Sequence, residues 1–90
     1  EEKSLLLDAV QLSKQAAKQS LEVKSISYQN YRGFAVILND GTEVVLGLSP
    51  FDYKLEKLLS IIGRLKSQGT TASRIELDYD GKAFIKEKKL

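Results

Sequence analysis

Three carboxylates recur at alternate positions near the end of the chain, at Glu76, Asp78 and Asp80. Carboxylate oxygens at close spacing can bind calcium, and a pair of carboxylates can act as general acid and base. Apolar residues alternate with these acids, however, which is typical of the solvent-facing side of a strand. The glycine-turned loop of a calcium-binding helix–loop–helix unit is missing as well. We therefore interpret the acids as the polar face of a strand and predict no metal site.

The composition removes most other chemistry, because the chain contains no cysteine and no histidine. It therefore has no disulfide framework, no histidine base beside a nucleophile, and few of the ligands that transition metals prefer. Carboxylates, lysine, serine and tyrosine are the reactive side chains that remain. We predict no catalytic residue, no cofactor and a function that is not enzymatic.

A nucleic-acid surface would need cationic residues clustered on one face. The formal net charge is only +2, and Lys86, Lys88 and Lys89 supply part of it at the chain end, where we expect a solvated tail. Gly63 and Gly69 are too far apart for the Gly-x-x-Gly loop of KH domains. Charge and motifs therefore give little support to nucleic-acid binding.

The apolar patterning predicts the elements that position these residues. It indicates an α+β fold with two helices on one face of a mostly antiparallel sheet of about five strands, in the order α-β-β-β-α-β-β. Ninety residues suffice for one core and are too few for two, so we expect a single domain over residues 1–90. The predicted helices span residues 2–20 and 50–68, and the predicted strands span residues 23–31, 34–39, 42–48, 74–79 and 82–86.

The second and third strands should form a hairpin, because Asp40-Gly41 suits the positive φ angles of a two-residue type I′ turn. That turn would place Ile37 opposite Val44. Both faces of the hairpin carry apolar residues, so we expect it in the interior of the sheet.

Both helices should bury an apolar stripe. The first helix carries one stripe and a second that widens it: Leu6, Ala9, Val10, Ser13 and Ala17, then Leu5, Leu12 and Ala16. For the second helix we predict Ser49 as N-cap, Asp52 reaching back to it, and a stop at Gly69. Its predicted buried stripe is Leu55, Leu58, Leu59, Ile62 and Leu65, with Lys54, Glu56, Lys57, Arg64 and Lys66 facing water.

The final strand, residues 82–87, has only the chain end after it. At a sheet edge it would present unpaired N–H and C=O groups on which another chain can add a strand, although its lysines could instead oppose such pairing. We expect Tyr28 and Phe84 in the core, and Tyr79, at the tip of the last hairpin, in a contact role.

Residues 33–85 resemble the C-terminal half of the β-domain of the FtsQ/DivIB bacterial cell-division proteins. The resemblance is carried by Val44-Val45-Leu46-Gly47, a helix that opens near Lys54-Leu55, and a last hairpin that runs from Ile75 to Ala83. In that family a strand ending in Leu-Gly precedes a helix that starts with Lys/Arg-Leu. Asp78 stands where the family commonly has arginine, and Glu76 replaces the usual aspartate.

The resemblance implies a non-enzymatic scaffold of the divisome that supports septum assembly. Its domain would lie on the extracytoplasmic (periplasmic) side of the inner membrane, in a longer single-pass protein with an upstream transmembrane helix and POTRA module. Partners resembling FtsB and FtsL would bind, the first by adding a strand to the final β-strand. The site residues carried over are Tyr79, Gly81, Lys82, Ala83, Phe84 and Ile85. A small α+β nucleic-acid-binding or general adaptor module and an enzyme subdomain are the alternatives.

Overall fold

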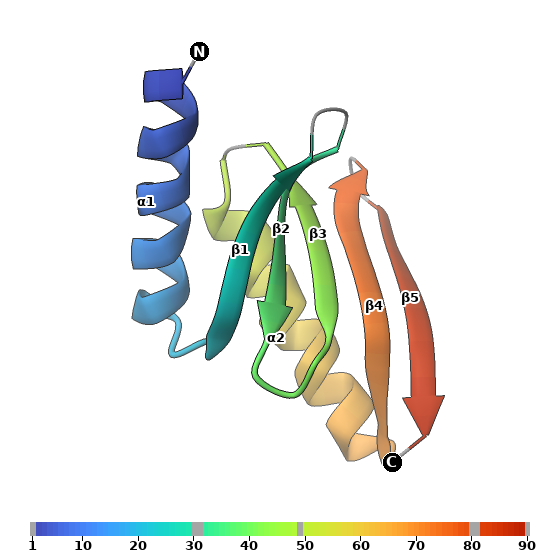
Figure 1. Cartoon of the computed structure of the whole chain (residues 1–90). Helices are drawn as coiled ribbons and strands as arrows, with labels where there is room; N and C mark the ends of the chain where they lie inside the picture. The colour runs from blue at the N-terminus through green and yellow to red at the C-terminus, as the bar shows by residue number, and fades with distance from the viewer. Residues whose placement is uncertain (1, 30–31, 49, 80–81, 90) are drawn as a thin grey trace.

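The computed structural model describes residues 2–29, 32–48, 50–79 and 82–89, with side chains except at residues 2–5, 78, 79 and 89. These residues form two helices and five strands in the predicted order (Figure 1). The elements are α1 Glu2–Lys18, β1 Val23–Gln29, β2 Gly33–Leu38, β3 Glu43–Gly47, α2 Asp52–Ser67, β4 Thr70–Tyr79 and β5 Lys82–Lys89.

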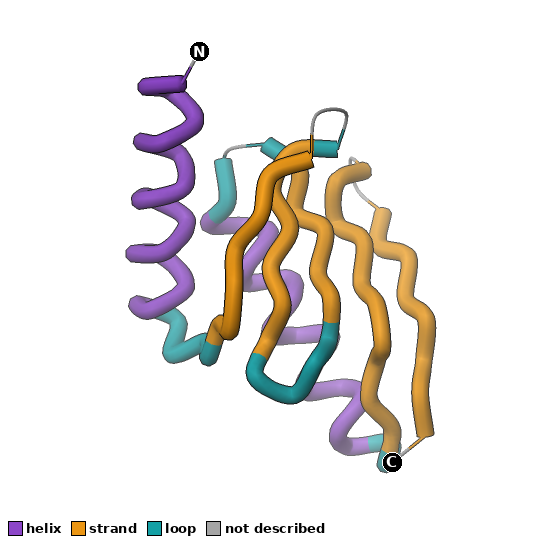
Figure 2. Tube along the Cα trace, viewed as in Figure 1, coloured by secondary structure: helices purple, strands orange, loops and turns teal. Residues whose placement is uncertain are grey.

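The strands lie in the spatial order β1-β2-β3-β4-β5. All neighbours are antiparallel except β3 and β4, which are parallel because α2 returns the chain along the sheet between them. In Figure 1 and Figure 2, α2 crosses one face of the sheet and α1 stands beside β1. The predicted α+β class and the mostly antiparallel sheet are confirmed, and the β2–β3 hairpin lies in the sheet interior as expected.

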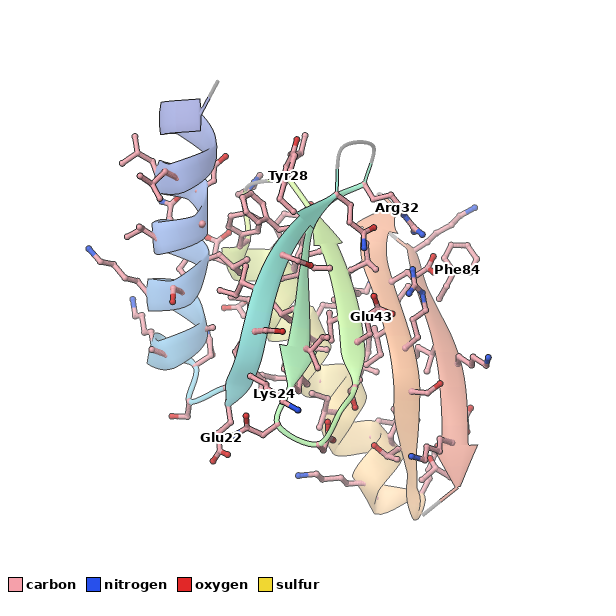
Figure 3. All side chains as sticks on the ribbon, in the orientation of Figure 1. Glu22, Lys24, Tyr28, Arg32, Glu43 and Phe84 are labelled. Carbon is pink, nitrogen blue, oxygen red and sulfur yellow. The ribbon has the colours of Figure 1, made fainter. Side chains whose placement is uncertain are left out.

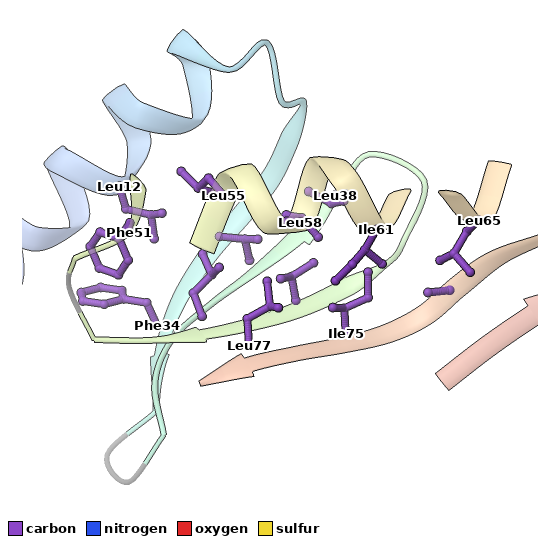
Figure 4. Packing of buried hydrophobic residues seen from close by; sticks show 14 residues of the cluster. Leu12, Phe34, Leu38, Phe51, Leu55, Leu58, Ile61, Leu65, Ile75 and Leu77 are labelled. Atoms are coloured by element: carbon purple, nitrogen blue, oxygen red, sulfur yellow. The ribbon is translucent and has the colours of Figure 1, made fainter. Parts of the chain in front are cut away.

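The hydrophobic core fills the space between the helices and one sheet face (Figure 4). Its buried members are Leu12, Phe34, Val36, Leu38, Val44, Leu46, Phe51, Leu55, Leu58, Ile61, Leu65, Ala72, Ile75 and Leu77. Phe51 packs edge to face on Phe34, with 5.7 Å between ring centroids. Residues that alternate with core positions along the strands point the other way, and we call their side of the sheet the open face. It carries Ala35, Val45 and Glu76.

The β2–β3 turn differs from the predicted two-residue type I′ turn. Leu38 N–H donates to Thr42 O and Gly41 N–H donates to Leu38 O, each at 2.9 Å, so the loop has three residues. Gly41 has a φ of +94°, which fits a type I turn followed by a left-handed glycine. The Thr42 N–H also donates to Asp40 Oδ1 at 2.9 Å, and this bond lowers the pKa of Asp40.

The extra loop residue changes the register of the hairpin. Ile37 lies opposite Glu43, and Val44 lies opposite Val36. The predicted pairing of Ile37 with Val44 is therefore wrong by one residue. Because side chains alternate with period two, the slip moves Val44 and Leu46 into the core and leaves Ile37 exposed on the open face.

Helix α1 ends within two residues of the predicted limit, but its buried side is narrower than predicted. Leu12 and Ala16 are buried, whereas Leu6 is 66% exposed and Val10 is also exposed. From the other stripe only Ala9 packs against the core, because α1 stands at the edge of the sheet. Neither α1 nor α2, as described, is long and apolar enough to cross a membrane.

The start of α2 also differs from prediction. The N-cap is Phe51, with no side-chain capping bond, and Pro50 precedes the helix. Lys54, which we expected to face water, is buried and donates from Nζ to the carbonyl oxygens of Leu46 and Leu48 at 2.8 and 2.7 Å. A buried ammonium group needs such acceptors. Ser49, the predicted N-cap, lies outside the described residues.

The buried face of α2 is rotated from the predicted stripe. Ile61 is buried, whereas Leu59 and Ile62 are only partly buried. The predicted stop is confirmed, since Gly69 has a φ of +74° and its N–H donates to Lys66 O at 3.0 Å.

Candidate partner-binding site

Strand β5 is the last strand of the sheet, so β4 is its one neighbour among the described strands. Its residues pair with β4 from Lys82, opposite Tyr79, to Lys89, opposite Thr70. The lysines expected in a solvated tail therefore belong to a strand, because β4 begins four residues earlier than predicted and provides a partner for them. The first register shift skips Ser73 of β4, and the second skips two residues of β4 against Ala83 of β5, so in both places the extra residue lies in β4. Strand β5 is continuous from Lys82 to Lys89.

One hydrogen bond shows which backbone groups of β5 face away from β4. Ser73 Oγ donates to the carbonyl oxygen of Lys86 at 3.3 Å, which places that carbonyl on the β4 side. Backbone groups point to opposite sides at successive residues of a strand. The N–H and C=O groups of Ile85, and by the same alternation those of Ala83, therefore point outward from the sheet.

The side chains of β5 alternate between the two faces. Ala83 and Ile85 are partly buried against the core. Lys82, Phe84 and Lys86 lie on the open face, and Figure 3 shows Phe84 on the outer side of the sheet away from α2. Phe84 is 52% exposed, so the prediction that it belongs to the core is wrong. Its partner in the ladder is Glu76, an open-face residue, and the register therefore turns Phe84 outward.

The other predicted aromatic residues have different positions. Tyr28 is also exposed, at 38%, because it lies near the end of β1, although its ring packs on Phe34 with 5.1 Å between centroids. The backbone of Tyr79 pairs with Lys82. The side chain of Tyr79 and all of Gly81 lie outside the described part of the structure, so the contact role of these two residues stays a prediction.

A chain of ion pairs covers the open face beside β5 (Figure 3 labels Arg32 and Glu43). Glu76 accepts from Arg74 Nε at 2.7 Å and from Arg32 at 2.9 Å, and Arg74 also pairs with Glu43. The hydrogen bond from Arg74, followed by that from Arg32, lowers the pKa of Glu76. The charged side chains on the open face of β4 thus form a network of ion pairs and are not simply solvated. Sequence reasoning missed it because Arg32 comes from a different hairpin.

The same face is hollowed next to the edge strand. A shallow depression of about 380 Å³ lies between Arg74, Glu76, Phe84, Ile85 and Lys86. Within the described residues, no group of three or more carboxylates gathers to hold a metal ion. The features of this region are thus an outward-facing backbone edge, an exposed ring and cationic side chains.

The opposite edge of the sheet is β1. Its register skips Lys24 between Val23 and Ser25, so the bulge lies in the edge strand itself. The backbone N–H of Leu38 points toward β3, where it donates to Thr42 O. Backbone groups alternate in direction along β2, so those of Ile37 point toward β1 and face those of its partner Ser25. The backbone groups of Ile26, the next residue of β1, therefore point outward.

Residues 1–79 match the family described as cell division protein FtsQ/DivIB, C-terminal. The chain belongs to this family. Its members are membrane-anchored, non-catalytic cell-division scaffolds whose extracytoplasmic domains take part in divisome protein interactions. The match includes α1 and β1, which precede the motifs that carried the resemblance, and it ends before β5. A comparison with the curated proteins found no match.

Two motifs of the FtsQ/DivIB resemblance have a clear structural role here. The Lys-Leu that opens α2 supplies Lys54, which ties the helix to the end of β3 through the carbonyls of Leu46 and Leu48. The Leu-Gly that ends β3 supplies Gly47, whose backbone a Cβ atom at Gly33, a residue with a φ of +81°, would overlap. Both motifs therefore fix how the chain leaves β3 toward α2, and neither forms a reactive site.

Proposed function

We propose that this domain is a non-enzymatic divisome scaffold that binds a partner protein by strand addition at β5. The partner would resemble FtsB, with an FtsL-like protein in the same assembly, and the site residues are those predicted from the sequence, Tyr79 and the segment 81–85. The domain would act on the extracytoplasmic side of the inner membrane, as part of a single-pass protein.

The observation that carries this proposal is the uninterrupted edge of β5 with outward-facing backbone groups at Ala83 and Ile85. An added strand gains main-chain hydrogen bonds from such an edge, and side-chain contacts set its specificity. Membership of a cell-division scaffold family supports the same function. The alternative of a nucleic-acid-binding module has weaker support, because Arg32 and Arg74 are paired with carboxylates.

The test uses matched proline substitutions in the two edge strands. Ile85→Pro removes an outward N–H from β5, and Ile26→Pro does the same in β1. Both isoleucines are partly buried against the core, so the two variants lose comparable packing. Binding to an FtsB-like extracytoplasmic segment, measured by calorimetry, should fall at least about tenfold for Ile85→Pro. It should stay near the parent value for Ile26→Pro.

Both variants must first show a cooperative melting transition. If the folded Ile85→Pro protein binds as tightly as the parent, β5 is not the docking edge. A loss confined to Ile26→Pro would move the docking site to β1.

A further inference from the structure

Strand β5 has a strong charge asymmetry between its two sides. The alternation places Lys82, Phe84, Lys86 and Lys88 on the open-face side, and all four are exposed. The other side carries Ala83 and Ile85, which extend the core toward the edge, and then the exposed Glu87. A strand added at this edge would therefore meet cations around one aromatic ring on one side, and apolar groups on the other.

Among the described side chains, few acids lie on the same side of the sheet as the lysines of β5. Lys86 lies opposite Arg74, which is itself a cation, and Lys88 lies opposite Thr71. Glu87 of β5 lies on the other side of the strand, and Glu76, the open-face acid opposite Phe84, already pairs with two arginines. No ion pair joins Lys82, Lys86 or Lys88 to a carboxylate in the described part of the chain. Their charge is available to a partner.

A second copy of β5 is a poor occupant of this edge. An antiparallel self-pairing that keeps the two open faces together can be centred on Phe84, Ile85 or Lys86. Centring on Phe84 places Lys82 opposite Lys86 of the other copy, and centring on Ile85 places Lys82 opposite Lys88. Centring on Lys86 places this lysine opposite its own counterpart. Like charges directly opposite each other destabilise a strand pair. The edge therefore disfavours its own copy and favours a strand of opposite charge.

We propose that the β5 edge selects an acidic amphipathic strand. Its five central residues would have acids at both ends, opposite Lys86 and Lys82. Aliphatic residues would lie opposite Ile85 and Ala83, and an aromatic or aliphatic residue would lie opposite Phe84. The acids would meet the lysines, the central residue would pack on the Phe84 ring beside the shallow depression, and the aliphatic residues would continue the core. This inference rests on the proposed function and adds the chemistry of the partner.

The probes are three synthetic peptides with blocked ends. The acidic peptide is Glu-Thr-Glu-Val-Phe-Val-Glu-Thr-Glu, whose palindromic order allows either strand direction. The basic peptide replaces each glutamate by lysine. The face-swapped peptide, Thr-Glu-Val-Glu-Phe-Glu-Val-Glu-Thr, keeps the composition of the acidic peptide but turns its acids toward Ala83 and Ile85. Binding to the parent domain is measured at low ionic strength, where charge interactions are least screened.

The acidic peptide should bind at least about tenfold more tightly than the other two. The double variant Lys86→Glu/Lys88→Glu should lose about tenfold in affinity for the acidic peptide and should gain affinity for the basic one. Lys14→Glu/Lys18→Glu changes the net charge equally on exposed positions of α1 and should leave peptide binding unchanged. Nonspecific charge attraction would not make the β5 variant alone prefer the basic peptide over the acidic one.

The remaining outcomes separate this inference from the proposed function. If Ile85→Pro abolishes binding of all three peptides and they otherwise bind alike, the docking edge stands and its selectivity for acids is wrong. If Ile85→Pro has no effect on peptide binding, both proposals fall. Equal binding of the acidic and face-swapped peptides overturns the alternating pattern. Lysine-dependent binding to phosphatidylglycerol vesicles without peptide binding would also overturn it, because the edge would then recognise a membrane surface.

Discussion

The two edges of the sheet are built differently although both are antiparallel strands of similar length. Strand β1 contains a bulge at Lys24 and stands next to α1, whereas β5 is uninterrupted and its pairing irregularities lie in β4. A bulge in an edge strand disturbs the spacing of its outward hydrogen-bonding groups. The difference indicates that β1 is protected against strand addition and that β5 is suited to it.

The two edges also differ in what their side chains offer. Ser25 and Ser27 of β1 lie on the open-face side, where β5 has Phe84 and Lys86. Serine gives a partner strand little to contact, while an exposed ring and ammonium groups provide both packing and charge. Edge geometry and edge chemistry thus distinguish the same strand, which is the reason to assign partner binding to β5.

Both edges belong to one sheet that is packed on α2. Substitutions in the core beneath this sheet should therefore have the largest effect on the free energy of unfolding. Leu58 is fully buried under the sheet, whereas its neighbour Leu59 is only partly buried. Leu58→Ala should lower the free energy of unfolding by about 2–5 kcal/mol, and Leu59→Ala should lower it clearly less. Urea denaturation of both variants measures this. Equal losses would mean that Leu58 and Leu59 are equally buried and that α2 presents a different face to the sheet.

A smaller effect should show whether the backbone of β5 is oriented as inferred. The N–H of Phe84 faces β4, so Phe84→Pro removes a ladder hydrogen bond and should cost roughly 1–3 kcal/mol more than Phe84→Ala. Ala83→Pro removes an N–H that points away from β4. It should therefore lower the free energy of unfolding by less than the difference between Phe84→Pro and Phe84→Ala. Thermal melting of the three variants gives the comparison. If Ala83→Pro is the most destabilising variant, the outward and inward positions are exchanged.

The element order could be predicted from the sequence because it depends on local signals. Apolar periodicity marks each element, and Gly41 and Gly69 mark a turn and a helix end. The register of the β2–β3 hairpin was missed because Asp-Gly suits both a two-residue loop and the last positions of a three-residue loop. That single residue decided which of Val44 and Ile37 entered the core.

The candidate site could be predicted only in part. The sequence predicted that the final strand could form a sheet edge, which the strand order shows, but the exposure of Phe84 depends on its register with β4. The inward turn of Lys54 depends on free carbonyls at the end of β3, and such acceptors leave no mark in the sequence. Pairings between distant segments, such as Arg32 with Glu76, are equally invisible to periodicity.

The smallest expected effect concerns the ion-pair network, which joins the end of the β1–β2 connection to β4. Arg74 and then Arg32 lower the pKa of Glu76 below its ordinary value of 4.5. A carboxylate with a lowered folded-state pKa stabilises the protein above the unfolded-state pKa, and this contribution is lost as pH falls through the folded-state value. Glu76→Gln should therefore cost no more than about 1 kcal/mol at neutral pH, because the pairs are partly exposed. The difference between parent and variant in unfolding free energy should shrink as the pH falls below 4.5. Binding of the acidic peptide should change little, since β5 itself is untouched; a large loss would show that the network couples the β1 side of the sheet to the docking edge.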